Sequence, residues 1–522
     1  MNQEKNIPRI VYQIFVPSFC DSNQDGVGDL KGIQNKLDYL QDLGVEAIWL
    51  SPIFLSSSYH KYDVIDYYKI DGNFGTEEDL VALIQDAAAR KIQVYLDFVM
   101  NHTSSQHAWF QDAQRNEDSP YRDFYIWKSP EKIRQERLEE REATADSGLK
   151  DPWHWPVQRA KEKYYSLFWR EMPHLNLANP ATKQALLDVA LYWLQRGVAG
   201  FRLDAAKHIF SDEVKAAHFW KVFSDEVRRS FPAVYFVGEV WTSAERVAPF
   251  FEGLTANFDF QLSDEIKNSV KLAQIPSSFI SSLQQRYNLF ASFNTEFVDA
   301  TFLSNHDQER VASFLDNDKE KLKAVANILF TLPGQPYIYY GEELGMLGRK
   351  PDECIREAFL WDERSKDSAR TNWQKPKYNT DSKVRPLAQQ KIDEHSIYTH
   401  YKNWIKQRKE IPSFAQISPV NLLDWPLNIE GIVSFQRTHS EGNTYVLHNL
   451  TNKAKAIPQI KEEEWEIKYK TPQQSEFQEK ILCVAPWSCV VLGIKTGNLN
   501  HQVKPTVRKK ARPSDGIIPG PG

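Results

Sequence analysis

The sequence predicts an α/β protein built on a (β/α)₈ TIM barrel, with an insertion domain after the third strand and a C-terminal antiparallel β-sandwich domain. Three observations predict this architecture. Apolar runs alternate with helical patterns over about the first 410 residues, one connection is far longer than the others, and the pattern then changes to short alternating segments. Parallel strands joined by helices, followed by a run of strands alone, are typical of an α/β domain with an added β domain.

Short apolar runs mark eight candidate barrel strands: residues 10–15, 47–50, 93–98, 200–203, 234–237, 258–261, 301–303 and 337–340. Amphipathic patterns between them predict helices, for example at residues 30–43, 76–90, 182–196 and 319–332. Eight strands alternating with helices is the count of a closed barrel. A doubly wound open sheet is the structural alternative.

The third and fourth strands are separated by much more chain than one crossover helix needs. Residues 103–178 are rich in Trp, Tyr and charge, and the mixed-charge run at 131–142 is typical of a solvated helix. A connection of this length predicts a small insertion domain or a lid over the strand ends. The barrel is therefore assigned to residues 1–102 and 179–410.

The pattern changes again after residue 411. Short alternating segments at 431–436, 443–449, 464–469, 479–484 and 488–494 predict an antiparallel β domain over residues 411–497. The tail at 498–522 is basic and then rich in Pro and Gly, so we expect it to be disordered.

The composition excludes several classes of protein. The net charge of −5 over 522 residues gives no basic field, so no nucleic-acid partner is expected. No apolar stretch of about 18 residues predicts a membrane span. The segment MNQEKNIPRI lacks the features of a signal peptide, so we expect a cytoplasmic monomer, or a secreted or periplasmic protein if a leader has been removed. The 4 cysteines are too sparse for a disulfide framework.

Three of the predicted strands lead into a carboxylate. The segments GFRLDAAKH, YFVGEVW and FLSNHDQER carry Asp204, Glu239 and Asp307 at or just beyond the end of an apolar run. Because the carboxyl ends of parallel strands meet at one rim of a barrel, we expect the three side chains to lie together there. Buried structural ion pairs are the alternative interpretation.

The neighbours of these carboxylates suggest different roles. Arg202 lies two residues before Asp204 on the same strand face, and its charge is expected to lower the pKa of a nucleophile. Glu239 follows an apolar run that is expected to raise the pKa of a general acid. An Asp nucleophile with a Glu acid is the pair that retaining glycoside hydrolysis needs. Asp307 and His306 would then bind hydroxyl groups of the distorted sugar.

These motifs resemble the short signatures of the α-amylase family, from about residue 10 to residue 494. The resemblance rests on DFVMNH at 97–102, on GFRLDAAKH, FVGEV and LSNHD, and on the second- and eighth-strand segments GVEAIWLSPIF and GQPYIYYGEELGM. It implies that Asp204 is the nucleophile, Glu239 the acid/base and Asp307 the stabiliser of the transition state. It also implies a set of substrate-binding residues at the scissile sugar: Tyr62, His102, Arg202 (with Asp97 in support) and His306.

Finer features of the resemblance concern specificity. Ala205 stands where relatives that cleave α-1,6 bonds often carry Val, and Lys207 and His208 resemble a pair that α-amylases use beyond the cleavage point. Tyr59 occupies a position where exo-acting relatives carry Asp. His174, within MPHLN, replaces the usual Asp of that segment. These features favour endo cleavage of α-1,4 bonds in starch or malto-oligosaccharides.

Three alternatives stay open. The first is an α-glucosidase or oligo-1,6-glucosidase that acts on short substrates. The second is a transglycosylase, which would share the glycosyl-enzyme intermediate. The third is a binding protein without activity, although such a protein should lack one of the three acids.

The clearest metal signal is the loop DSNQDGVGD at residues 21–29. Side-chain oxygens of Asp21, Asn23, Asp25 and Asp29 and the carbonyl of Val27 match the first part of an EF-hand loop. Its twelfth position is Gly32 and not Glu, so the loop is not an EF-hand. Similar loops in family relatives bind Ca²⁺, which is the expected cofactor; a hydrogen-bonded Asx turn is the alternative. A second calcium site at Asn101 resembles the α-amylase site, with its other ligands unassigned.

Overall fold

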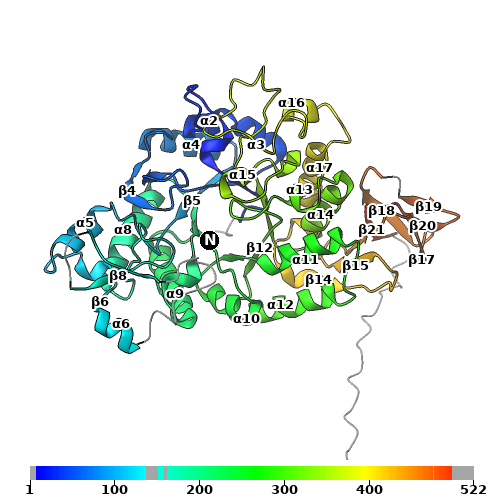
Figure 1. Cartoon of the computed structure of the whole chain (residues 1–522). Coiled ribbons are helices and arrows are strands. Elements are labelled where there is room, and N and C mark those ends of the chain that lie inside the picture. Colours follow the sequence, from blue (N-terminus) through cyan, green and yellow to red (C-terminus); the bar gives the residue numbers. More distant parts are fainter. Residues whose placement is uncertain (1–6, 137–150, 158–160, 474, 496–522) are drawn as a thin grey trace, which may run out of the picture.

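The computed structural model describes residues 7–136, 151–157, 161–473 and 475–495 (Figure 1). Eight parallel strands close into a barrel in the order β1-β13-β12-β11-β10-β9-β5-β2, which confirms the predicted barrel and rules out the open sheet. The strands are β1 (Val11–Ile14), β2 (Ala47–Leu50), β5 (Gln93–Phe98), β9 (Gly200–Leu203), β10 (Tyr235–Gly238), β11 (Ala256–Phe258), β12 (Val298–Phe302) and β13 (Gln335–Tyr339).

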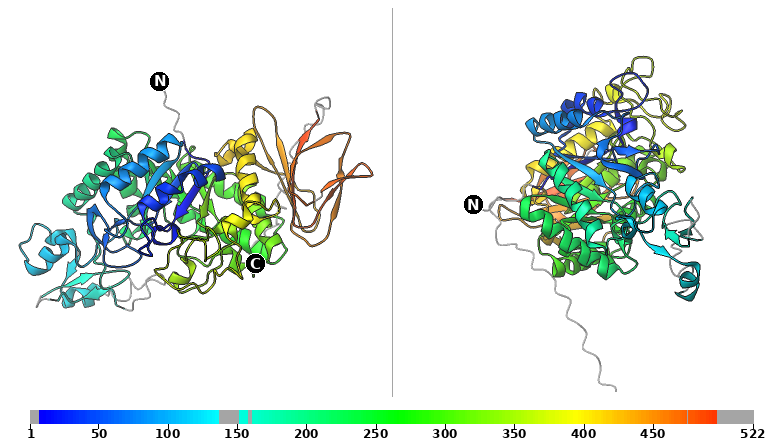
Figure 2. Two further views of the ribbon diagram at one scale, coloured as in Figure 1. Left: turned by 90° about the horizontal axis from the view of Figure 1, so that it is seen from above. Right: turned by 90° about the vertical axis from the view of Figure 1, so that its left-hand side faces the viewer.

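Helices surround this barrel (Figures 1 and 2). The longer ones are α2 (Leu30–Asn35), α3 (Leu37–Leu43), α4 (Glu77–Ala89), α8 (Pro180–Gln195), α9 (Glu213–Ser230), α11 (Phe260–Lys271), α12 (Phe279–Phe293), α14 (Lys319–Thr331) and α17 (Ile397–Glu410). Short turns of helix include α1 (Val16–Phe19), η2 (Ala206–Ile209), α10 (Ala244–Val247), η3 (Ala248–Glu252), α13 (Val311–Phe314), η4 (Glu342–Leu344), α15 (Asp352–Ile355), α16 (Leu387–Gln390) and α18 (Pro412–Ala415).

Local sequence explains where several helices begin. Thr76 and Asp79 form a capping box at the start of α4, and Asp318 caps α14 through the amides of Glu320 and Lys321. The prediction of one helix over residues 30–43 is wrong, because the chain leaves helical geometry at Lys36 (φ −107°, ψ 8°) and splits it into α2 and α3.

The predicted sixth strand at 258–261 is also displaced. The observed strand β11 ends at Phe258, and Asp259 caps α11 by accepting a hydrogen bond from the amide of Leu262. The aromatic residues Phe258 and Phe260 therefore belong to different elements. A short apolar run cannot by itself distinguish a strand from the start of a buried helix.

Side chains inside the barrel form a compact aromatic core beneath the strand ends. Trp49, Tyr95, Tyr235, Phe258 and Tyr337 are all buried there. The rings of Tyr95 and Tyr235 stack with centroids 4.9 Å apart, and Trp49 lies 5.5 Å from Phe258. This filled interior leaves the chemistry to the upper rim.

The insertion lies between β5 and α8, at the cyan end of the molecule in Figure 1. It contains α5 (Ala108–Arg115), η1 (Arg122–Phe124), α6 (Pro130–Glu136) and a small sheet in the order β6-β8-β7, formed by Trp127–Lys128, Lys163–Tyr165 and Trp153–His154. The helix expected at 131–142 is present as α6 up to Glu136, and residues 137–142 lie outside the described part. Bridges pair His102 with His174 and Tyr125 with Leu175, so the insertion is joined to the third strand end.

The C-terminal domain consists of two antiparallel sheets, which confirms the predicted sandwich (Figure 2). One sheet has the order β14-β15-β16-β21-β18: Leu422–Asp424, Ile432–Arg437, Thr444–Asn449, Cys489–Ile494 and Trp465–Lys470. The other is β17-β20-β19: Lys455–Lys461, Ile481–Val484 and Glu476–Gln478. Strands β14, β17 and β19 were not predicted; β17 and β19 flank β20 as edge strands with largely exposed side chains, and β14 has only three residues, so their hydrophobic alternation is weak.

Two predictions about the chain as a whole remain open. The tail at 498–522 lies outside the described residues, and the exact domain boundaries stay predictions. Within the part that the structure describes, no helix combines the length and apolar character needed to cross a membrane.

Candidate active site

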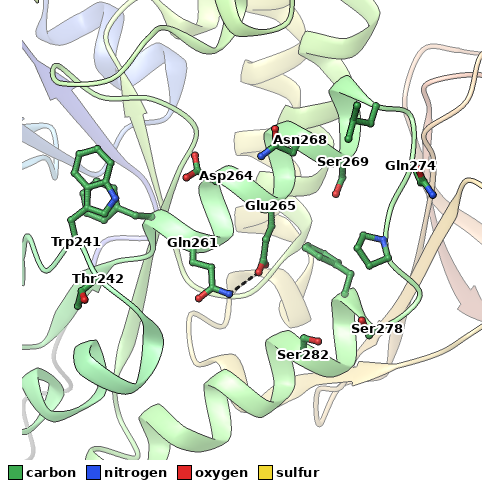
Figure 3. A pocket seen from close by; sticks show the side chains of 14 residues that line it. Trp241, Thr242, Gln261, Asp264, Glu265, Asn268, Ser269, Gln274, Ser278 and Ser282 are labelled. Carbon is green, nitrogen blue, oxygen red and sulfur yellow. Dashed lines mark hydrogen bonds between the residues drawn. The ribbon is translucent and has the colours of Figure 1, made fainter. Parts of the chain in front are cut away.

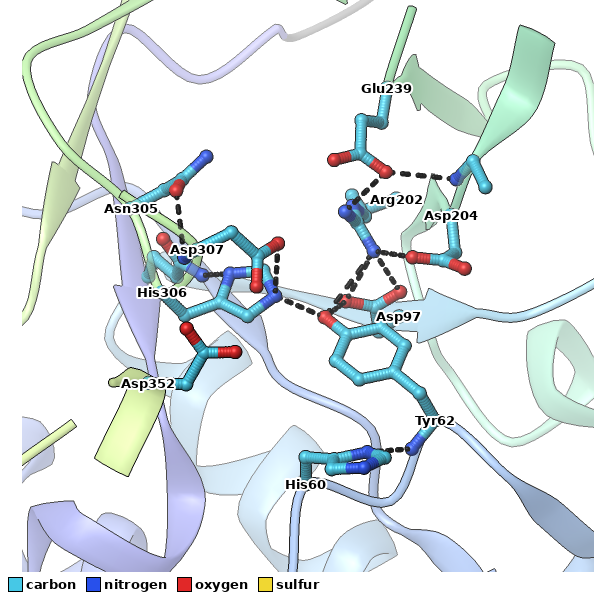
Figure 4. A network of polar contacts seen from close by, with 12 residues as sticks. His60, Tyr62, Asp97, Arg202, Asp204, Glu239, Asn305, His306, Asp307 and Asp352 are labelled. Atoms are coloured by element: carbon cyan, nitrogen blue, oxygen red, sulfur yellow. Dashed lines mark hydrogen bonds and ion pairs between the residues drawn. The ribbon is translucent and has the colours of Figure 1, made fainter. Parts of the chain in front are cut away.

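The three predicted carboxylates meet at the carboxyl end of the barrel (Figure 4). Asp204 follows the last residue of β9, Glu239 follows the last residue of β10, and Asp307 lies on the loop after β12. They line a cavity of about 480 Å³. The other predicted residues in its wall are Tyr62, His102, Lys207 and His208, and the wall also contains His60, Phe168, Trp169, Met172, Ala205, Trp241, Lys350, Asp352 and Arg356.

Arg202 contacts three of the acidic side chains of this site. Its side chain is buried, with 2% exposed, and its Nη1 donates to Asp204 Oδ1 at 2.7 Å and to Asp97 Oδ1 at 2.8 Å. Its Nη2 lies 2.9 Å from Glu239 Oε2. One guanidinium therefore holds both the predicted nucleophile and the predicted acid, while Asp97 orients the guanidinium from below, as the resemblance implied.

The backbone after Asp204 also positions Glu239. Ala205 adopts a left-handed conformation (φ 47°, ψ 40°), and its amide donates to Glu239 Oε2 at 2.9 Å. A left-handed conformation at a residue other than Gly costs on the order of 1 kcal/mol and persists where the surrounding structure fixes it. The turn after β9 thus couples the two carboxylates through the main chain.

Burial dominates the titration of both carboxylates. It raises the pKa of Glu239 to about 7, although Arg202 opposes the shift, and this confirms the raised pKa expected for an acid. Burial also raises the pKa of Asp204 despite the lowering effect of Arg202. The expectation that Arg202 would lower the pKa of Asp204 is therefore wrong in its net direction, because the cost of desolvating the carboxylate is the larger effect.

Asp307 has the opposite electrostatic character. Burial alone raises its pKa, whereas His306 and Arg356 lower it, and the net pKa is about 2. Burial lowers the pKa of His306 itself to about 3, so this ring is neutral near pH 7. The lasting positive charge is Arg356, whose Nη2 lies 2.9 Å from Asp307 Oδ1. Asp307 is accordingly an ionised carboxylate at neutral pH.

Aromatic rings form the floor of the site. Tyr62 stacks on His306 with ring centroids 5.5 Å apart and an interplanar angle of 8°, and its hydroxyl donates to Asp97 Oδ2 at 3.0 Å. His102 Nε2 lies 3.2 Å from the carbonyl oxygen of Tyr62, and burial lowers the pKa of His102 to about 4. These residues offer a flat, neutral surface and hydrogen-bonding groups, which suit a sugar ring.

Lys207 and His208 lie on η2 at the other side of the cavity. Lys207 Nζ donates to the carbonyl oxygen of Trp241 at 2.6 Å, and the His208 ring lies 5.7 Å from Phe168. All nine predicted catalytic and substrate-binding residues are thus brought to one rim, with Lys207 beside Trp241 and His208 beside Phe168.

Sequence reasoning missed Arg356. It lies on the loop after β13, where its Nη1 donates to the Tyr59 hydroxyl at 3.0 Å and its Nε to the carbonyl of His306 at 2.8 Å. Asp352 also pairs with it at 3.3 Å. Irregular loops carry no periodicity, so no sequence signal could place this guanidinium beside Asp307. Trp241 is the last residue of the segment YFVGEVW, to which the sequence assigns no separate role.

The predicted calcium loop is held by its own backbone amides. Asp21 Oδ2 accepts from Gly26 N at 2.7 Å, and Asp25 Oδ1 accepts from Val27 N at 2.8 Å. Asp29 Oδ1 caps α2 through Gly32 N at 2.6 Å. These bonds are those of the Asx-turn alternative. Over the described ranges, no group of three or more His, Cys, Asp or Glu side chains is arranged as a metal site.

The donor chemistry of this loop nevertheless fits Ca²⁺. It provides three carboxylates, the amide of Asn23 and the Val27 carbonyl, all of which are oxygen ligands. At the second predicted calcium site, Asn101 Oδ1 is buried without a hydrogen-bond partner among the described residues, and so is His174 Nδ1. Burial lowers the pKa of His174 to about 3, so its ring is neutral near pH 7. The other ligands of this site are unassigned, and the site stays a prediction.

A closed parallel barrel with acidic side chains at its carboxyl rim has the arrangement of a TIM-barrel enzyme. The family model described as "Alpha amylase, catalytic domain" matches residues 13–416. The chain is 40% identical to Alpha-amylase 3 of Dictyoglomus thermophilum over 490 residues, covering 93% of each chain. It is 34% identical to a 4-alpha-glucanotransferase of Thermotoga neapolitana, over 85% of this chain and 96% of the relative.

The crystal structure of the alpha-amylase from H. orenii has the same architecture. It superposes with a TM-score of 0.83 at 37% identity, covering 93% of this chain and 99% of the other. The chain therefore belongs to the α-amylase family, and it is an enzyme of the glycoside hydrolase type. The names of its relatives include both an amylase and a glucanotransferase, so similarity fixes the family and leaves the particular activity to the site.

Proposed function

We propose that this enzyme hydrolyses α-1,4-glucosidic bonds within starch and malto-oligosaccharides, with retention of anomeric configuration. The observation that carries the proposal is the Arg202 guanidinium, which holds Asp204 and Glu239 at 2.7 and 2.9 Å. Two carboxylates on one guanidinium favour the short separation of about 5–5.5 Å typical of retaining enzymes, since inverting enzymes need room for a water between them.

The reaction proceeds in two displacements. Asp204 attacks the anomeric carbon while Glu239, protonated at pH values below its pKa of about 7, gives its proton to the leaving oxygen. A covalent glycosyl-enzyme forms. The ionised Glu239 then takes a proton from water, which attacks the same carbon and releases Asp204. Asp307 stays ionised throughout and accepts hydrogen bonds from the distorted sugar.

Tyr59 supports the endo mode. Arg356 donates to its hydroxyl, and Trp373 stacks on its ring with centroids 5.4 Å apart. Exo-acting relatives place Asp at this position, according to the resemblance, where its charge would clamp a chain end. Here an uncharged tyrosine takes that place, and the guanidinium of Arg356 pairs with Asp307 and Asp352.

Two alternative activities share this machinery. An α-glucosidase or oligo-1,6-glucosidase would need a catalytic cavity that is closed around the non-reducing end of the substrate. A transglycosylase would need a sugar acceptor to reach the glycosyl-enzyme before water, and the similarity to 4-alpha-glucanotransferase makes this the stronger rival.

We further propose that Ca²⁺ binds the loop at residues 21–29 through side-chain oxygens of Asp21, Asn23, Asp25 and Asp29 and the Val27 carbonyl. A divalent cation would supply charge that stabilises this loop beside α1 and α2. No catalytic step depends on it.

Early products from maltoheptaose test the activity. Maltose and maltotriose without early glucose would support an endo-acting α-amylase, and NMR should detect the α-anomer first if configuration is retained. Glucose released one unit at a time would instead assign an exo-glucosidase. Products longer than maltoheptaose would assign a transglycosylase.

A further inference from the structure

A second large groove lies outside the catalytic cavity, over α11 and the loop that leads into α12 (Figure 3). Its volume is about 940 Å³. We call it the α11 groove. Its walls include Trp241, Phe260, Gln261, Asn268, Leu272, Gln274 and Ser278.

Trp241 joins this groove to the catalytic cavity, because its side chain lines both. It is 46% exposed and stacks face to face on Phe260, with ring centroids 4.5 Å apart and an interplanar angle of 7°. Phe260 is buried and fixes the orientation of the tryptophan ring. Lys207 Nζ also holds the Trp241 carbonyl, so this platform is anchored on two sides.

The position of Glu239 indicates which part of a bound glucan would lie in the groove. The acid protonates the leaving oxygen, so the leaving part of a glucan must lie on the side of Glu239. Trp241 follows Glu239 by two residues on the same loop. Arg356 and Asp352 line the catalytic cavity but not the α11 groove, so the groove extends from the leaving-group side.

The lining of the groove suits a neutral sugar chain. Gln261, Asp264 and Asn268 share the exposed face of α11, spaced three and four residues apart. The charge of Asp264 is paired with Lys267 at 3.0 Å, and Glu265 is held by both Nη atoms of Arg286 at 2.6 and 2.9 Å. Gln261 Nε2 also donates to Glu265 Oε1 at 2.9 Å (Figure 3). The amides of Asn268 and Gln274 and the hydroxyl of Ser282 line the rest of the groove, and such groups match sugar hydroxyls better than a charged group.

Apolar surface is present at both ends of the groove. Leu272 is 70% exposed at the end of α11, and Trp241 lies near its start. Twelve residues of helix separate Phe260 from Leu272, which at 1.5 Å per residue is roughly 18 Å. The groove is therefore long enough for several sugar units in an extended line.

We propose that the α11 groove binds the leaving-group end of a long α-glucan, beyond the units held in the catalytic cavity. This inference rests on the proposed function and adds to it a dependence on substrate length. Trp241 stacks on one sugar face, and the amides of Asn268 and Gln274 bind hydroxyl groups further along the chain.

The double variant Asn268→Ala/Gln274→Ala tests the proposal. We expect the ratio of kcat/KM for maltoheptaose to kcat/KM for maltotriose to fall about fivefold or more, as for the loss of one or two hydrogen bonds. Maltoheptaose should also bind more weakly by a similar factor when Asp204→Asn is added to prevent turnover. Gln184→Ala removes an exposed amide on α8, outside the groove, and serves as the matched control. Gln274→Ala alone, in a loop, replaces the double variant if that variant does not fold.

The outcomes separate this inference from the function on which it rests. If the wild-type enzyme cleaves neither oligosaccharide, the proposed function is wrong. If it cleaves both, and the double variant keeps the wild-type ratio and the wild-type affinity for maltoheptaose, then the α11 groove does not bind glucan and only the further inference is overturned.

Discussion

Two clusters of acidic residues in this enzyme have similar composition and different partners. At the barrel rim, Asp204 and Glu239 bond to Arg202, and Asp307 bonds to Arg356. In the loop at residues 21–29, the carboxylates accept hydrogen bonds from backbone amides two to seven residues away. One cluster is organised by buried guanidinium groups from distant segments, and the other by its own main chain.

Burial by itself does not distinguish the two clusters, since Asp21 and Asp29 of the loop are buried as well. The difference lies in what replaces the lost water. Buried charges that face one another shift each other's pKa, whereas amides of the local backbone stabilise a carboxylate without bringing in a second ionisable group. The rim cluster is thus suited to proton transfer, and the loop to structure or to a cation.

The largest expected effect is at the nucleophile. Asp204→Asn should lower kcat about 100-fold or more, because an amide cannot form the glycosyl ester, while the melting temperature changes little. Asp25→Asn, the same substitution in the loop, should lower kcat far less, since it acts through stability. Hydrolysis of maltoheptaose at saturation measures both. Residual activity of Asp204→Asn above about 1% would remove the nucleophile assignment.

Glu239→Gln should have the next largest effect, and its size should depend on the substrate. Activated aryl glucosides need little protonation of the leaving group, so they should lose much less activity than maltoheptaose. The wild-type enzyme should lose kcat/KM as the pH rises through about 7, where Glu239 gives up its proton, and the variant should lack this limb. Equal losses on both substrates would contradict an acid role.

Arg356→Gln tests the charge beside Asp307. Without the guanidinium, the effect of burial is opposed less strongly, so the pKa of Asp307 should rise from about 2. Because the ionised form of Asp307 is required, the fall of kcat/KM on the acid side, which Asp204 already causes in the wild-type enzyme, should move to higher pH in the variant. The pH profile of kcat/KM, with folding followed by circular dichroism, is the measurement. If kcat/KM of the wild-type enzyme and of the variant fall at the same pH on the acid side, Arg356 does not control the pKa of Asp307.

The smallest effect is expected in the loop. Addition of Ca²⁺ to chelator-treated enzyme should raise the melting temperature by a few degrees, since a ligand that binds only the folded state stabilises it. Asp21→Asn/Asp25→Asn should remove this response. If Ca²⁺ does not change the melting temperature of the wild-type enzyme, the loop is an Asx turn without a bound metal.

Much of the barrel could be predicted from the sequence, because strands buried on both faces are continuous apolar runs. Six of the predicted strands share three or more residues with the observed ones, as at Ala47–Leu50 and Gly200–Leu203, whereas the strand predicted at 301–303 shares only two residues with β12. The predicted strand at 258–261 is displaced because Phe258 ends β11 whereas Phe260 begins α11. The edge strands β17 and β19 were missed because exposed residues interrupt their alternation.

By itself, the sequence determined that Asp204, Glu239 and Asp307 follow barrel strands, and that they therefore meet at one rim. It also determined the spacing of oxygen atoms in the loop at residues 21–29. Only the tertiary structure decided the charge states. The pKa of Asp204 depends on how completely it is desolvated, and the low pKa of Asp307 depends on groups packed around it, among them Arg356, which is 49 residues away along the chain. Desolvation and long-range pairing are properties of the packed molecule, and neither leaves a pattern in the sequence.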